Sequence, residues 1–394
     1  AAMYLSPLAE LINPAFTLWV VGPSGALKTS LATLALSHFG AFDSRTPPAQ
    51  WRDTANYLEK ALCLTKDLPL LIDDFAPGVG GEDVRKLEDK VEAVDRAQGN
   101  RVGRGRLRSD TSTRGRYSPR GMAVATGETL PGGHQSRMAR EFVVELEKGM
   151  VNLPAFSQAQ RDAALYPHAM AGYILWLRDR WADMTEGKLE SKWREKRDKA
   201  QKEGQNLRLP EAVSWLWWGL ALATQFAVDL GTLPKEEGDQ KMEEAWGLLV
   251  KLANAQSARL EDARPGRRFL EVLGVLIAQE RAVLGIRLGA DGDKPAPHQE
   301  LVGYHDADSV YLLPEAAHKV VADFCRRAGQ PFSWNALAVR RDLDRMGVLT
   351  HPEGRLTDGV RSSDGWVRAV DCTPMSGQIG LGESGRVTPY VGRC

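Results

Sequence analysis

Short apolar runs alternate with segments of helical periodicity between residues 18 and 146. The apolar runs lie at residues 18–21, 68–72, 122–125 and 142–146, and each is almost free of charge. Such runs are typical of buried parallel strands. Residues 54–64 and 82–97 instead carry apolar side chains at the spacing of one helix face. The alternation predicts an α/β fold, with a parallel sheet and helices on its faces.

The pattern after residue 149 is helical. We expect helices in residues 158–183, 212–228, 239–260 and 267–288, and a solvated helix or exposed arm in the charged segment 186–206. The most apolar segment, 212–228, is shorter than the roughly 20 residues that a membrane span needs. Ser214, Thr224 and Gln225 also interrupt it. We therefore expect a buried core helix here and no membrane partner.

A glycine- and proline-containing linker at residues 289–299 precedes a third region. Its pattern predicts a strand at 309–313, helices at 314–328 and 333–346, and a hairpin formed by 348–350 and 366–370 around a turn at 352–354. This order suggests a winged-helix-like domain. We therefore expect an α/β core at residues 1–150, an all-α domain at 151–290, a winged-helix-like domain at 300–372 and a disordered tail at 373–394.

A candidate phosphate-binding loop follows the first apolar run and opens a helix. Backbone N–H groups in such a loop and the helix dipole favour an anion at one point. Lys28 would then contact the β- and γ-phosphates of ATP, and the Thr29 hydroxyl would ligate Mg²⁺. Leu27 stands where the usual pattern has glycine, and an ordinary strand–turn–helix is the alternative. The expected cofactor-binding residues are Gly22, Pro23, Ser24, Gly25, Ala26, Leu27, Lys28, Thr29 and Ser30.

Polar residues also follow two later apolar runs. Asp73 and Asp74 end the run at 68–72, and Thr126 follows the run at 122–125. Ligands bind at the carboxyl ends of strands in open α/β sheets. We expect Asp73 to hold Mg²⁺, Asp74 to polarise the attacking water and Thr126 to sense the γ-phosphate. The alternatives are a helix cap or turn for the aspartates and a turn for Thr126.

Two arginines, Arg137 and Arg140, lie just before the last apolar run. An arginine at such a position can reach the nucleotide site of a neighbouring subunit and neutralise transition-state charge. We expect one of them, Arg140 ahead of Arg137, to do so, which requires an oligomer. A pair of surface arginines is the alternative.

Residues 96–120 contain eight arginines and one acidic residue, interspersed with glycines. Clustered arginine on a flexible loop suits nucleic-acid phosphates, whose binding is salt-dependent and independent of base sequence. We expect a mobile basic loop that contacts DNA, and a solvated loop is the alternative. The candidate contacts are Arg101, Arg104, Arg106 and Arg108.

Composition restricts the remaining chemistry. Lysine plus arginine equals aspartate plus glutamate, at 51 each, so an anion-binding surface has to come from local clustering. The four cysteines are scattered and the seven histidines lack metal-ligand spacing, which argues against a disulfide framework or a zinc site. Scattered cysteines fit a reducing cytoplasm. An amino-terminal signal pattern is not visible.

Five stretches together resemble the ATPase part of primase–helicase-like proteins of phages, plasmids and integrated elements. They are GPSGALKTSLATLALSHFG, LPLLIDDFAP, RAQGNRVGRGRLRSD, MAVATGE and SRMAREFVVEL, and the later YLLPEAAHKVVADF and RRDLDRMGVL are similar to the winged-helix end of such proteins. The resemblance implies an AAA+-like ring ATPase, close to superfamily 3 helicases, that uses ATP and Mg²⁺. It carries Lys28, Thr29, Asp73, Asp74 and Thr126 onto the nucleotide site. A primase catalytic signature is not visible, so a primase or polymerase would be a partner.

The leading hypothesis is an ATP-dependent DNA helicase or translocase that acts in replication of a mobile genetic element. It would assemble as a homo-oligomeric ring with ATP between subunits, and its DNA would be single-stranded or forked. A non-motor replication initiator or helicase loader that uses ATP as a switch is the alternative. A small-molecule kinase fits less well, because the arginine-rich segment and the winged-helix-like region have no role in one.

Overall fold

The computed structural model describes residues 1–78, 81–107, 109, 111–132, 135–185, 188–203, 209–286, 296–306, 309–329, 332–349, 358–362, 365–371, 379–381 and 387–389. The chain divides into two compact units, Ala1–Leu260 and Glu261–Cys394. This division differs from the expected boundaries at 150 and 290. The helices before residue 260 pack with the sheet, and the segment after it packs with the C-terminal elements.

Five parallel strands form the sheet of the first unit, which confirms the predicted α/β class. Their spatial order is β2 (Ala49–Gln50), β3 (Pro69–Phe75), β6 (Met122–Gly127), β1 (Thr17–Val21) and β7 (Glu141–Glu145). At the carboxyl end, Val21 of β1 pairs with Gly127 of β6 and Glu145 of β7. Because every strand points the same way, the segments that follow β1, β3, β6 and β7 share one edge.

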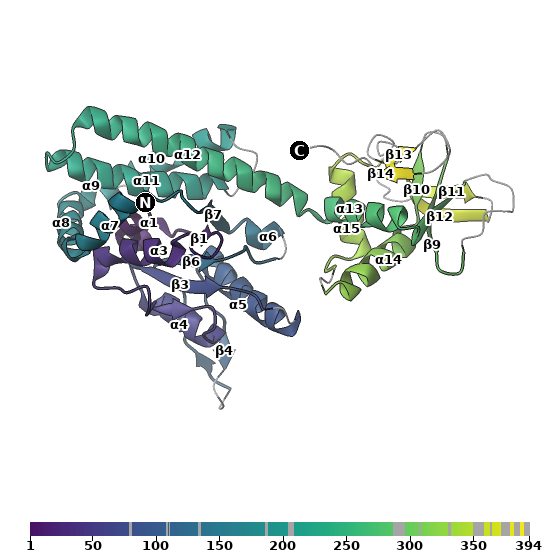
Figure 1. The fold of residues 1–394 in the computed structure, drawn as a ribbon, viewed down its shortest axis with the longest axis horizontal. Helices are drawn as coiled ribbons and strands as arrows, with labels where there is room; N and C mark the ends of the chain where they lie inside the picture. The colour runs from purple at the N-terminus through teal and green to yellow at the C-terminus, as the bar shows by residue number, and fades with distance from the viewer. Residues whose placement is uncertain are drawn as a thin grey trace. The chain divides into compact units, whose positions relative to one another are not determined.

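Helices cover both faces of the sheet (Figure 1), and alternate residues of each strand point to opposite faces. One face holds Trp19, Ile72 and Ala125, covered by α4 (Ala55–Leu64) and α5 (Gly81–Asn100). Trp19 stacks on Trp51 with ring centroids 5.4 Å apart. The other face packs against α3 (Lys28–Leu36), the amino-terminal helices α1 (Ala2–Leu5) and α2 (Ala9–Ile12), and the helical segment that follows the sheet. The short helix α6 (Gln135–Met138) precedes β7.

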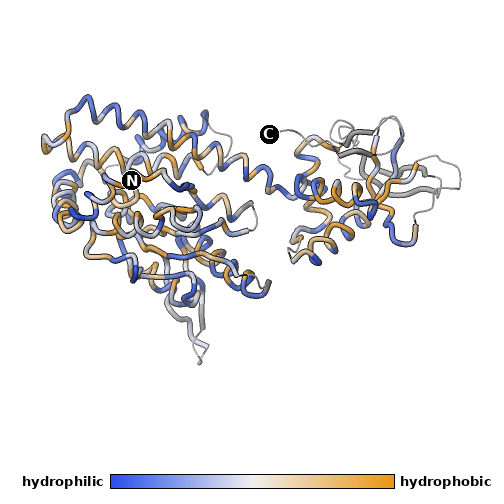
Figure 2. The backbone as a smooth tube through the Cα atoms, viewed as in Figure 1, coloured by the Kyte–Doolittle hydropathy of each residue, from blue (hydrophilic) through white to orange (hydrophobic). Residues whose placement is uncertain are grey.

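Helices follow the sheet in sequence and belong to the same compact unit. They are α7 (Leu153–Arg161), α8 (Tyr166–Arg178), α9 (Trp181–Thr185), α10 (Lys188–Glu203), α11 (Leu209–Asp229) and α12 (Lys235–Asp262). The apolar α11 is a core helix, and in the part of the chain that the structure describes no helix could cross a bilayer. The hydrophilic α10 packs on α11 through Trp193, which stacks on Trp215 at 4.7 Å between centroids. Figure 2 shows the contrast between these two helices.

The second unit contains α13 (Pro265–Ala278), β8 (Ala282–Ile286), β9 (Glu300–His305), β10 (Val310–Leu312), α14 (Pro314–Arg327), α15 (Ala336–Arg345), β11 (Asp358–Ser362) and β12 (Gly365–Asp371). Its sheet has the order β11-β12-β10-β9-β8, and only β8 and β9 pair in parallel. The strand paired with β12 is β11, so the expected partner at 348–350 is wrong. The expected turn at 352–354 lies outside the described residues.

The C-terminal segment 373–394 contains two short described strands. The strands β13 (Ile379–Leu381) and β14 (Val387–Pro389) pair antiparallel with each other. The expected disorder therefore does not hold for these two short stretches.

One buried carboxylate ties α13 to α15. Asp342 Oδ2 accepts a hydrogen bond from the Gly266 N–H at 2.9 Å, and its Oδ1 accepts one from Arg264 Nη2 at 2.9 Å. Asp342 is 8% exposed, so water cannot replace these donors. The contact fixes the start of α13 against α15, and leucines of both helices complete the core around it.

Replacing Asp342 with alanine should lower the stability of the second unit by about 2–3 kcal/mol, because three hydrogen bonds to a carboxylate are lost and the Gly266 N–H stays buried. Native-state hydrogen exchange of the α13 and α15 amides measures this. The control is Glu315→Ala, whose side chain is 80% exposed and 3.7 Å from Arg340. That change should alter the stability of the second unit by less than about 0.5 kcal/mol. Equal exchange in the two variants would contradict the structural role of Asp342.

Candidate functional site

The loop between β1 and α3 starts with a glycine that no other residue could replace. A Cβ atom on Gly22 would lie 2.0 Å from the carbonyl oxygen of Leu146 in the segment after β7. The Gly22 N–H also donates to the carbonyl of Gly127 at 3.2 Å. The ends of β1, β6 and β7 thus meet at the start of this loop.

Leu27 ends the loop in a left-handed backbone conformation, with φ of 64°. This is the position at which the usual loop pattern has glycine, and the conformation explains that preference. A leucine there costs roughly 1–2 kcal/mol. The turn therefore forms without the glycine, and the strain is carried by the surrounding contacts.

Lys28 is the first residue of α3, and its Nζ donates to the carbonyl of Pro23 at 3.0 Å. The amine therefore lies back over the loop. Pro23, Ser24 and Gly25 are exposed, whereas Ala26 is buried. A Cβ atom on Gly25 would lie 4.0 Å from Nζ of Lys148, so a second amine is close to the same loop.

The Asp73 carboxylate joins the loop to the neighbouring strands. Its Oδ1 accepts hydrogen bonds from the hydroxyl of Thr29 at 2.8 Å and from the hydroxyl of Thr126 at 2.5 Å. Asp73 is 6% exposed and Thr126 is 1% exposed. Since β6 lies between β1 and β3, Thr126 is between the loop and the acid. The structure thus brings together three residues that lie far apart in the sequence.

Asp74 differs from Asp73 in exposure, backbone conformation and hydrogen bonding. It is exposed, its backbone is left-handed with φ of 63°, and the pairing of β3 with β6 shifts register between Ile72 and Phe75. Its N–H donates to the Thr126 hydroxyl at 3.2 Å. The Arg52 guanidinium lies 3.9 Å from its carboxylate. The two adjacent acids therefore have separate tasks: Asp73 holds the strand edge together, and Asp74 presents a carboxylate to solvent.

The oxygens of Thr29 and Asp73 fit a magnesium ion. Both are hard donors, and Mg²⁺ in nucleotide sites binds through one or two protein oxygens while it keeps waters and phosphate oxygens. A protein-only metal cage would need more ligands. Among the described residues, no group of three or more His, Cys, Asp or Glu side chains could form one.

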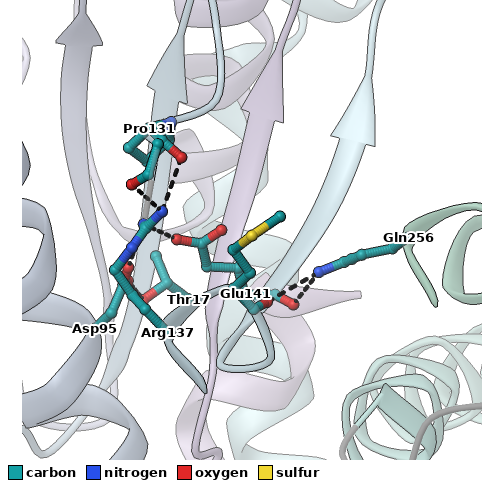
Figure 3. A network of polar contacts seen from close by, with 8 residues as sticks. Thr17, Asp95, Pro131, Arg137, Glu141 and Gln256 are labelled. Carbon is teal, nitrogen blue, oxygen red and sulfur yellow. Dashed lines mark hydrogen bonds and ion pairs between the residues drawn. The ribbon is translucent and has the colours of Figure 1, made fainter. Parts of the chain in front are cut away.

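Arg137 is not placed as expected, because its guanidinium is buried in a polar network at the opposite, amino end of the strands (Figure 3). It is 7% exposed and pairs with Asp95 at 3.3 Å and with Glu141. It also donates to the carbonyls of Pro131 and Gly132, each at 2.7 Å. A side chain held by four acceptors cannot reach another subunit, so Arg137 has a structural role here.

Other contacts extend this network. The Thr17 hydroxyl donates to Asp95 at 2.7 Å, and Gln256 of α12 donates to the backbone carbonyl of Glu141 at 2.7 Å. Sequence reasoning did not find it, because Asp95 and Glu141 lie within ordinary helix and strand patterns. Burial raises the pKa of Glu141 well above its usual value, and the Asp95 charge adds to this while Arg137 opposes it. Burial also raises the pKa of Asp95.

Arg140, the other arginine candidate, has a different position. Its side chain lies over the end of α5, where a Cβ atom on Gly99 would be 2.4 Å from Arg140 Cδ. Its Nη2 is 3.5 Å from the Asn100 side-chain oxygen. A pocket of about 250 Å³ adjoins it and also includes Glu211. Arg140 is therefore partly accessible, as a contact with another subunit requires.

The arginine-rich segment is partly ordered, contrary to the expectation of a mobile loop. The strands β4 (Arg106–Leu107) and β5 (Thr113–Arg114) pair antiparallel and extend away from the sheet (Figure 1). A Cβ atom on Gly103 would lie 2.1 Å from the Tyr117 carbonyl oxygen, so the base of this hairpin is tightly closed. Arg108 lies outside the described residues.

Two of the four arginines predicted to contact DNA are used inside the protein. Arg101 donates to the carbonyl of Gly121 at 2.7 Å, and burial lowers its pKa to about 10. Arg104 pairs with the buried Glu59 at 3.4 Å, and its N–H donates to the same carboxylate at 2.6 Å. These contacts anchor the base of the hairpin. The Arg104 side chain is still 52% exposed, and the DNA contacts of the two arginines stay predictions.

The raised pKa of Glu141 predicts a stability that falls with pH. Its carboxyl group binds a proton in the folded state at pH values where the unfolded chain, with a pKa near 4.5, has lost it. The contribution of this group to stability is fully present below the unfolded pKa and is lost as the pH rises through the higher pKa of the folded state. Glu141→Gln should flatten this part of the profile and unfold at an equal or higher temperature than wild type at pH 8.

Thermal unfolding between pH 5 and 8 measures the effect. The control is Glu145→Gln, which changes the same charge on the same strand at a 52% exposed side chain paired with Arg259. That variant should keep the wild-type slope. Identical slopes for wild type and Glu141→Gln would show that the network holds no shared proton.

Comparison with protein-family models and with curated proteins finds no match to this chain. The functional assignment therefore depends on the geometry of the site and on the motifs that form it.

Proposed function

We propose that this protein is an ATP-dependent DNA translocase or helicase of a mobile genetic element, which works as a homo-oligomeric ring. The observation that carries the proposal is the meeting of the Thr29 and Thr126 hydroxyls on one oxygen of Asp73, beside the loop that ends in Lys28. A phosphate-binding loop, an acid and a polar sensor at one sheet edge are the parts that nucleoside triphosphate hydrolysis needs.

Each of these residues has a separate task in the proposed reaction. The loop N–H groups and Lys28 bind the phosphates, and Lys148 lies near enough to add a second positive charge. Thr29 and Asp73 would hold Mg²⁺, which neutralises charge on the β- and γ-phosphates. The exposed Asp74 orients the attacking water, and Thr126 fixes the Asp74 backbone through its hydrogen bond. Lys28 has to leave the Pro23 carbonyl to contact a phosphate.

The proposed contact with DNA is the β4–β5 hairpin. Arg106 and Arg114 occupy paired backbone positions of its two strands, and Arg116 is exposed at its base. Phosphates bind to such a cluster without regard to base sequence. The hairpin follows α5 in the chain, and α5 follows β3, which carries the two acids.

The proposed ring requires an arginine that acts in the nucleotide site of the neighbouring subunit. Because Arg137 is buried in its own network, Arg140 is the candidate for this role. Arg137 supports it indirectly, because its carbonyl accepts the Arg140 N–H at 2.7 Å and its side chain fixes the turn before β7. The Arg140 carbonyl in turn accepts the N–H of Thr17 at 2.9 Å, which ties this turn to β1.

A replication initiator or helicase loader remains the second candidate. The support for it is the order β10, α14, α15 and the β11–β12 hairpin in the second unit, where two helices precede a hairpin, although β11 and not the expected 348–350 pairs with β12. Such a domain would bind duplex DNA, whereas a motor unwinds it. A strand-displacement assay with forked DNA distinguishes the two, and a primase or polymerase partner fits either.

Replacing Lys28 with alanine should reduce ATP turnover by about 100-fold and weaken nucleotide binding, because the charge on the β- and γ-phosphates is lost. Asp74→Asn should also stop turnover but leave binding intact, since it affects only the attacking water. Steady-state ATPase assays and titration with a fluorescent nucleotide measure these. Lys86→Ala, which changes an exposed lysine of α5 paired with Glu82, should behave as wild type. Unchanged turnover in Lys28→Ala would refute the site.

Removing arginines from the hairpin should weaken DNA binding and make its affinity less dependent on salt concentration. Each lost phosphate contact lowers the slope of log affinity against log salt by about 0.7 for single strands. The double variant Arg106→Ala with Arg108→Ala should therefore lose roughly 1.4 from this slope, as measured by fluorescence anisotropy.

The matched control is Arg96→Ala, which removes an arginine of α5 that is 67% exposed and paired with Glu92. It should keep the wild-type slope. Arg101→Ala should lower thermal stability instead, because its guanidinium holds the Gly121 carbonyl. An equal loss of slope in Arg96→Ala and the double variant would show that the hairpin is not the contact.

A further inference from the structure

A pocket of about 700 Å³ lies among the helices that follow the sheet, away from the nucleotide loop. It is enclosed by α8, α9, α10, α11 and the start of α12. Sites for small molecules have volumes of about 300–1,000 Å³. The apolar part of its lining consists of Trp176, Met184, Trp217, Trp218, Ala221, Leu222, Val228 and Met242.

The charged part of the lining consists of three basic side chains and one acid, namely Arg180, Lys192, Lys235 and Asp239, and Thr224, Gln225 and Gly238 complete it. Arg180 is fixed in place, since it pairs with Asp229 at 2.8 Å and lies 4.3 Å from the Trp176 ring centroid. Lys192 and Lys235 form no ion pair with any residue that the structure describes. Lys235 also opens the 28-residue helix α12, whose first N–H groups favour an anion.

The faces of the tryptophans are largely taken by the protein's own groups. Tyr173 stacks on Trp176 with centroids 5.8 Å apart, and Arg180 lies against the same indole. Lys196 covers Trp217 at 4.2 Å. A nucleobase therefore lacks a free aromatic face to stack on at these two rings. Methionine side chains adapt to ligands of irregular shape, and the pocket has two of them.

We infer that this pocket binds a small apolar molecule with one anionic group, such as a carboxylate. The apolar body lies against Met184, Leu222 and Met242, and the anion lies toward Lys192 and Lys235. Binding joins α10 to the start of α12 through the ligand. The inference does not depend on ATP hydrolysis or DNA binding, so it stands or falls separately from the proposed function.

Calorimetric titration of the full chain with decanoate tests the inference. Wild type should show one saturable site, and decanol, which has the same chain without the charge, should bind about tenfold more weakly. Lys192→Gln with Lys235→Gln should lower the decanoate affinity at least tenfold and leave decanol unchanged. Absence of saturable binding to wild type would overturn the inference, as would equal affinities for decanoate and decanol.

Filling the pocket gives an independent test of its location. Ala221→Trp should abolish decanoate binding, and Met242→Trp is a second variant in case the first fails to fold. Thermal unfolding identifies a folded variant, and Leu248→Trp on the outer surface of α12 is the control, because Leu248 is 57% exposed. Undiminished binding to a folded, filled variant would place decanoate elsewhere, for example on the exposed leucines of α7 and α8, and would refute the site.

Discussion

One oxygen of Asp73 determines how the candidate site is built. Two hydroxyls from separate segments, Thr29 and Thr126, donate to it, and the strand that carries it, β3, pairs regularly with β6 as far as Ile72, the residue before Asp73. This arrangement exists only because the strands run parallel and end at the same edge. A shift of β3 by one residue would turn Asp73 to the other face of the sheet and separate all three groups.

Two of the seven non-glycine residues with positive φ in the described part of the chain lie beside the same oxygen. Leu27 and Asp74 both have positive φ angles without being glycine, and they precede Lys28 and follow Asp73 in the chain. Residues in this conformation persist only where their surroundings hold them, and such outliers cluster at functional sites. Here the surroundings are Leu146 against Gly22 and the Thr126 hydroxyl on the Asp74 N–H. The strain supports the view that this edge is a site and not an ordinary turn.

The sequence was informative where a pattern reflects one dominant force. Apolar runs located β1, β3, β6 and β7, and polar residues at their ends located Asp73 and Thr126. It was misleading for Arg137 and Arg101, because the sequence around an arginine gives no sign of a buried carboxylate or carbonyl far away in the chain. The division at residue 260 was also hidden, since α12 has the same helical pattern on both sides of it. Lys148 and Arg52 gave no local signal, although each follows a strand end.

The last turn of α5 contacts the Arg140 side chain and leads into the β4–β5 hairpin. Gly99 leaves just enough space for the Arg140 side chain, and the chain then passes through Arg101 into the hairpin. No side chain separates the helix backbone from the arginine at that point. Any larger residue at position 99 would force the Arg140 side chain away from α5. The absence of a single methyl group therefore sets how closely the turn before β7 approaches this helix.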